Sequence, residues 1–144
     1  RISFLVGRRD VVAAFKKLRT QIDFGMFLPV QKAAIAALTG PLDSVKRQCG
    51  EYQARRDALC GGLRSIGWNV PDSHGSMFVW APLPTGYTDS MAFCLELIDK
   101  AGGICTPGFS FGPSGEGYVR FALTLPVERI REAVASIAAS GMIR

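Results

Sequence analysis

The chain has 144 residues, of which 48% are hydrophobic and 20% are charged, a composition typical of a globular protein with a buried core. Its net charge of +5 comes from basic residues scattered in pairs along expected helices, which favours solvated helix faces over nucleic-acid binding. No apolar run approaches the roughly 18 residues that would span a membrane, and the N-terminus does not read as a secretory signal. We therefore expect a cytoplasmic protein that binds neither nucleic acid nor a membrane.

The first part of the chain is predicted to form two helices, at about residues 10–20 and 29–39, because apolar residues recur there at helical spacing. Gly40-Pro41 then combines two helix-breaking residues and is the expected domain boundary, between residues 1–40 and residues 41–144. A long amphipathic helix is predicted to follow, over residues 44–66.

The second part alternates short strands and helices. The strands are expected at residues 68–70, 76–82, 104–106 and 118–123, and the helices at residues 89–101 and from 126 onward. Residues 76–82 are apolar on both pleat faces, which predicts a central strand covered on both sides, with Phe78 and Trp80 in the core. The apolar residues of helix 89–101 that we expect to face inward are Met91, Cys94, Leu95 and Ile98. This order predicts an α/β or α+β domain in which helices cover a small mixed sheet.

The cysteines and the single histidine do not form a metal-ligand pattern. Cys49, Cys60, Cys94 and Cys105 include no CxxC pair and no Cys/His cluster. We therefore expect no metal, and reduced thiols that pack as small apolar side chains. Acid–base chemistry at His74 is disfavoured because no nucleophile or carboxylate motif lies near it in the sequence.

A glycine-rich loop that leads directly into a β-prone segment is the most distinctive stretch of the sequence. Glycines and prolines punctuate residues 107–117, which indicates tight turns or a close approach of the backbone. From Tyr118 the pattern has period two, so Val119 and Phe121 share one face and Arg120 lies on the other. An arginine on a strand beside such a loop can clamp a carboxylate, and the alternative is a surface ion pair, for which Glu116 is near enough.

The run PGFSFGPSGEGYVRFAL, at residues 107–123, resembles the C-terminal signature of the class I/II aminotransferases that use pyridoxal phosphate. The resemblance is strongest to the branch that contains LL-diaminopimelate aminotransferase. It implies that Arg120, the arginine of the GEGYxR pattern, binds the substrate's α-carboxylate. The loop residues that would form a wall of the substrate pocket are Pro107, Gly108, Ser110, Phe111 and Gly112.

Two further stretches are similar to the same family. Arg1, followed at the family's distance by Gly7, resembles the arginine that contacts the cofactor phosphate, although Ser3 stands where the family usually has glycine. The Schiff-base lysine would then lie upstream, and the chain would be a C-terminal fragment without its catalytic residue. The run DFGMFLPVQKAAIAALTGP also matches, but Leu28 aligns with an asparagine of the LL-diaminopimelate enzymes, so the particular substrate stays open.

The resemblance implies a fold-type I enzyme of amino-acid metabolism, a homodimer when complete, that transfers an amino group from an amino acid to a 2-oxo acid. Residues 1–40 would be the end of its large cofactor-binding domain and residues 41–144 its small domain. The fragment alone is expected to be inactive. Two alternatives stay open: a regulatory α+β module that binds an amino acid through Arg120 without catalysis, and an interaction domain whose helices from Asp10 and Asp43 form an oligomer surface.

Overall fold

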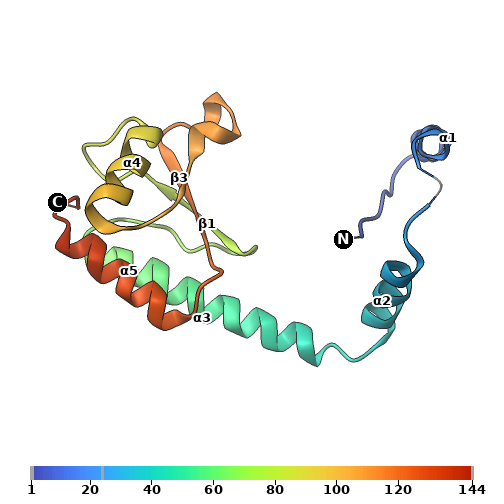
Figure 1. Ribbon diagram of the computed structural model, residues 1–144, viewed down its shortest axis with the longest axis horizontal. Coiled ribbons are helices and arrows are strands. Elements are labelled where there is room, and N and C mark those ends of the chain that lie inside the picture. The colour runs from blue at the N-terminus through green and yellow to red at the C-terminus, as the bar shows by residue number, and fades with distance from the viewer. Residues whose placement is uncertain (1, 24, 144) are drawn as a thin grey trace. The chain divides into compact units, whose positions relative to one another are not determined.

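The computed structural model describes residues 2–23 and 25–143, and the chain divides into two compact units, residues 1–46 and 47–144. The first unit contains α1 (Arg9–Ile22) and α2 (Leu28–Thr39), both drawn in Figure 1. Both helices were predicted, and a proline near the start of α2 suits the first turn of a helix. Neither helix buries a described residue, and Leu18 and Leu38 are more than half exposed.

The second unit is built on a three-stranded antiparallel sheet with strand order β1-β3-β2. Its elements are α3 (Asp43–Ser65, which begins just before the division), β1 (Phe78–Pro82), α4 (Ser90–Ala101), β2 (Thr106–Pro107), the 3₁₀ turns η1 (Gly108–Phe111) and η2 (Pro113–Gly115), β3 (Tyr118–Ala122) and α5 (Val127–Ala139). The register aligns Trp80 of β1 and Thr106 of β2 with Arg120 of β3. A small sheet with helices around it was predicted, and the structure confirms it.

The core of this unit lies on one face of the sheet. Val79, Ala81 and Val119 are fully buried there, each one residue away from an outward-facing neighbour in its strand. The helices contribute Leu59 and Leu63 from α3, Phe93 and Leu97 from α4, and Ile130, Val134 and Ile137 from α5. Each large side chain buried in this way stabilises the fold by about 1.5–3 kcal/mol relative to leaving it exposed.

Helices α3 and α5 lie side by side in Figure 1, and a glycine sets how closely they pack. A Cβ added at Gly62 of α3 would stand 3.0 Å from the Val134 Cγ2 of α5. Glycine inside a helix costs about 1 kcal/mol relative to alanine, so this position is held by packing rather than by helix propensity.

The strand predicted at residues 76–82 is shorter than expected and is not covered on both sides. Strand β1 lies at an edge of the sheet, because β3 takes the central place. Trp80 is 38% exposed and Phe78 is half-buried, so neither belongs to the core. Residues 76–82 are apolar on both faces of the strand. Such a pattern does not distinguish a strand that is buried on both faces from one whose aromatic face is exposed.

Two other predictions need correction. In α4, Phe93 and Leu97 are buried with Cys94, whereas Met91, Leu95 and Ile98 are exposed, because the helix carries apolar residues on more than one side. Residues 68–70 form no strand. Trp68 is nevertheless buried, and its indole N–H donates to the carbonyl of Pro82 at 2.8 Å.

Candidate functional site

Arg120 lies on the central strand and on the sheet face opposite the buried Val119 and Phe121, which we call the open face because Trp80 and Tyr118 on it are partly exposed. Its side chain is half-buried, and its Nε lies out of solvent with no hydrogen-bond partner among residues 2–23 and 25–143. Buried polar atoms in folded proteins are nearly always hydrogen-bonded, and leaving one unpaired costs about 1–3 kcal/mol. An arginine that is held in this state is oriented to receive an acceptor.

Two phenylalanine rings lie close to the guanidinium of Arg120. Its Cζ is 4.2 Å from the ring centroid of Phe78 on β1 and 4.6 Å from that of Phe111 on the loop. Cation–π contacts at such distances stabilise the charge and restrict the side chain to few orientations. The rings therefore hold Arg120 without accepting its hydrogen bonds, and in the described part of the chain its Nε has no acceptor.

The same face carries a second aromatic pair. The rings of Trp80 and Tyr118 stack with their centroids 5.5 Å apart, and Phe111 meets Trp80 edge-on at 5.6 Å. Trp80 and Tyr118 are each 38% exposed. Arg120 is thus flanked by an aromatic patch, which we define as Phe78, Trp80, Phe111 and Tyr118.

The glycine-rich loop brings Phe111 to this face through a close contact between two of its own glycines. A Cβ on Gly108 would lie 2.0 Å from the carbonyl oxygen of Gly115 and 2.6 Å from that of Tyr118, so no side chain fits there. Gly112 has φ of 111°, in the left-handed region that favours glycine. Tight turns and a close backbone approach were predicted here, and the structure confirms both.

Glu116 does not pair with Arg120. Its carboxylate oxygen Oε1 accepts from the backbone N–H of Ser90 at 2.7 Å and from that of Gly117 at 3.0 Å. These two donors hold the pKa of Glu116 below its usual range. Within the described residues Arg120 has no ion-pair partner, so the surface ion pair that the sequence left open is not formed.

The predicted loop residues do not all reach Arg120. Phe111 contacts it, whereas Gly108 packs against the backbone of Gly115, and Pro107 pairs with Val119 in the sheet. Ser110 is exposed. Arg1, the residue that the resemblance assigns to the cofactor phosphate, lies outside the described residues.

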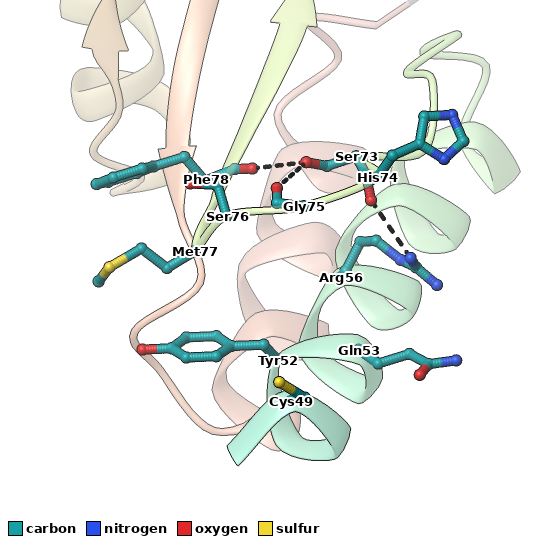
Figure 2. A pocket seen from close by; sticks show the side chains of 10 residues that line it. All are labelled: Cys49, Tyr52, Gln53, Arg56, Ser73, His74, Gly75, Ser76, Met77 and Phe78. Atoms are coloured by element: carbon teal, nitrogen blue, oxygen red, sulfur yellow. Dashed lines mark hydrogen bonds between the residues drawn. The ribbon is translucent and has the colours of Figure 1, made fainter. Parts of the chain in front are cut away.

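A pocket of about 600 Å³ lies next to Phe78, between α3 and the segment that leads into β1. Figure 2 shows Tyr52 and Arg56 projecting from α3 on one side and Met77 on the other. An Arg56 Nη donates to the carbonyl of Ser73 at 3.3 Å, which ties the segment to the helix. His74 is exposed, and its ring points away from Tyr52 and Met77.

Sequence reasoning missed the aromatic patch. Phe78 and Trp80 were expected in the core. The pairing of β1 with β3 sets Trp80 opposite Arg120, so Phe78 and Trp80 lie on the same face of the sheet as Arg120. The pairing register is the signal that would have found them. Within the described part of the chain, no three His, Cys, Asp or Glu residues gather as metal ligands, and no helix there is long and apolar enough to cross a membrane.

Comparison with known proteins shows which family the chain belongs to. Residues 1–137 match the family model described as aminotransferase class I and II. LL-diaminopimelate aminotransferase of Halothermothrix orenii is 44% identical over 134 residues, which are 93% of this chain and 34% of that protein. A protein of the same name from Gloeobacter violaceus is 39% identical over 142 residues, 99% of this chain and 36% of that protein.

Solved structures give the same result. An aminotransferase from Staphylococcus aureus matches with a TM-score of 0.83 and 32% identity, over 93% of this chain and 35% of that one. Substrate-bound BacF from Bacillus subtilis matches with a TM-score of 0.84 and 30% identity, over 93% of this chain and 34% of that one. The chain therefore spans about a third of the length of the relatives it matches.

Proposed function

The chain belongs to the class I and II aminotransferase family, and on that basis we propose that it is the C-terminal part of a pyridoxal-phosphate-dependent aminotransferase. The complete protein transfers an amino group from an amino acid to a 2-oxo acid. Arg120 holds the α-carboxylate of the amino acid.

The observation that carries this proposal is the unpaired Nε of Arg120 on the open face of the sheet. A guanidinium presents planar N–H groups that match the two oxygens of a carboxylate, and a hydrogen bond to a charged group contributes about 1.5–3 kcal/mol. A carboxylate that binds Arg120 would supply hydrogen-bond acceptors that the described residues do not provide.

The aromatic patch supports the same assignment by its effect on water. Phe78 and Phe111 cover the guanidinium, so an arriving carboxylate exchanges water for a less polar environment in which charge attraction is stronger. A substrate held at its carboxylate has its α-carbon fixed relative to the sheet, which is the positioning that the reaction requires.

The chain's own residues contribute on the substrate side of this reaction. Pyridoxal phosphate supplies the ring that withdraws electrons from the α-carbon when it is bound. The cofactor contact that the resemblance assigns to this chain is Arg1, and the lysine that bonds the cofactor would precede Arg1 in the complete protein. Residues 1–40 then end the large cofactor-binding domain, and residues 41–144 form the small domain of a cytoplasmic homodimer.

Replacing Arg120 tests the proposal in the complete enzyme. Arg120→Lys keeps the charge but loses the planar pair of donors, so we expect kcat/KM for the amino acid to fall about 10- to 100-fold with a raised KM. Arg129→Lys is the matched control, because Arg129 pairs with Glu132 on the surface of α5. An unchanged kcat/KM in Arg120→Lys would exclude the clamp.

The absorption spectrum of the complete protein separates catalysis from mere binding. A visible band from the lysine-bound cofactor, which shifts to shorter wavelength when one amino acid is added, is the expected result. A colourless protein that gains no band with added pyridoxal phosphate, yet binds an amino acid saturably through Arg120, would favour the regulatory module. The 144-residue chain itself is expected to show no transamination, and measurable turnover by it would contradict that part of the proposal.

A further inference from the structure

Two cysteines stand in contact where α4 meets the start of the glycine-rich loop. Their Sγ atoms are 3.3 Å apart. Cys94 lies in α4 and is 4% exposed, and Cys105 is half-buried directly before β2. The other two cysteines differ, since Cys60 is buried in α3 and Cys49 is exposed.

The backbone on both sides of this pair is already held in place. Gly102 ends α4 in the left-handed conformation and turns the chain back toward β2. Beyond Cys105, the N–H of Phe109 donates to the Ser90 Oγ of α4 at 3.3 Å, and Glu116 accepts from the N–H of the same serine. A disulfide needs its sulfur atoms at about 2.05 Å, so the two sulfur atoms, now 3.3 Å apart, have to approach by little more than 1 Å.

We propose that Cys94 and Cys105 form a modification site, a thiol pair that a low-molecular-weight disulfide oxidises to an intrachain disulfide. The thiolate of Cys105, the more exposed of the two, attacks one sulfur of the reagent, whose S–S bond breaks and releases one thiol. The thiolate of Cys94 then attacks the Cys105 Sγ and releases the second thiol. Two cysteine thiols lose their protons and two electrons, and one reagent disulfide is reduced to two thiols.

The surroundings of the pair set its rate. Burial raises the pKa of both thiols, and the contact between the two sulfur atoms raises that of Cys105 further, so few thiolates are present at neutral pH. Oxidation is therefore slow at pH 7 and accelerates as the pH rises. Once formed, the bond fixes the chain that leads to Phe109 and Phe111 against α4.

Tryptic mapping without reduction tests the proposal directly. Cleavage after lysine and arginine places the four cysteines in four different peptides, residues 48–55, 57–64, 65–100 and 101–120. After treatment of the folded protein with oxidised glutathione, we expect peptides 65–100 and 101–120 to appear as one cross-linked species that dithiothreitol separates. The map of the unsubstituted protein decides the result, so it does not depend on any variant's folding.

Matched variants and a second measurement sharpen the test. Cys49→Ser should leave the cross-link intact, whereas Cys94→Ser and Cys105→Ser should abolish it. In the oxidised protein, hydrogen exchange at the Phe109 amide should slow relative to the reduced protein. If the two peptides stay separate in folded protein at pH 8 to 9 and join only in denaturant, or if glutathione adds to Cys49 alone, the proposal is wrong.

Discussion

The two faces of the β1–β3 strand pair both carry apolar side chains, but the two faces have different roles. On the covered face Val79 and Val119 have no exposed surface, and Phe121 packs edge-on against Trp68 at 5.7 Å. On the open face Trp80 and Tyr118 keep more than a third of their surface exposed beside Arg120. The covered face thus stabilises the unit. The open face retains exposed apolar surface and the unpaired Nε of Arg120, and both features suit a face that binds a ligand.

Truncating one side chain on each face gives the largest expected effect. Phe121→Ala should destabilise the protein by about 3–5 kcal/mol, because it opens a cavity between the sheet and Trp68. Trp80→Ala should cost less, about 1–2 kcal/mol, since Trp80 is 38% exposed and loses its ring contacts with Tyr118 and Phe111 at a surface. Urea unfolding measures both, and equal losses would remove the distinction between the two faces.

The loop that supplies Phe111 to the open face is expected to depend on Gly108. Gly108→Ala places a methyl group 2.0 Å from the Gly115 carbonyl oxygen, so backbone has to move and we expect a loss of about 1–3 kcal/mol. Gly61→Ala is the control, because nothing lies within 4 Å of a Cβ there. Alanine at this position, one turn before the end of α3, should stabilise by about 0.5–1 kcal/mol. Thermal unfolding should move in opposite directions for the two variants.

The periodicity of the sequence predicted those features of the structure that depend on residues close to one another in the chain. The alternation from Tyr118 to Leu123 placed Arg120 opposite the buried residues Val119 and Phe121, and the structure agrees. The glycines of the loop predicted a close approach of the backbone, and Gly108 makes one. The resemblance to class I and II aminotransferases rested on the same stretch, and the comparisons confirm the family.

The features that the sequence did not predict depend on contacts between segments that are far apart in the chain. Phe78 and Trp80 were expected in the core, because an apolar run does not reveal which of its faces the sheet leaves open. Glu116 was considered as a partner for Arg120, whereas it accepts from Ser90, which lies 26 positions earlier. Helix α4 has apolar residues on two sides, and the sequence does not show which side is buried. In the structure Phe93 faces the core in place of Leu95, and its ring packs against Trp68 and Tyr87.

Replacing Arg120 by an apolar residue separates stability from binding on the open face. Arg120→Met removes a buried unpaired Nε, which favours folding, and two cation–π contacts, which oppose it. We expect the free energy of unfolding to change by less than about 1 kcal/mol, measured by urea titration. A loss of several kcal/mol would mean that Arg120 is there to hold the sheet together.

The smallest expected effect is the pH dependence from Glu116, which joins the loop to the first turn of α4. The backbone donors of Ser90 and Gly117 lower its pKa in the folded protein, so the unfolded chain takes up a proton first as the pH falls. Its contribution to stability is therefore complete above the usual glutamate pKa of about 4.3 and is lost as the pH falls through the lower folded value.

Glu116→Gln keeps an acceptor oxygen but removes the charge near the positive end of the α4 dipole. Its melting temperature should lie below that of the unsubstituted protein at pH 7, and the two should converge only when the pH falls below the lowered folded-state pKa of Glu116, where both side chains are neutral. Melting temperatures measured from pH 3 to 7 give this difference directly. A constant difference across that range would show that the charge of Glu116 is not what joins the loop to α4.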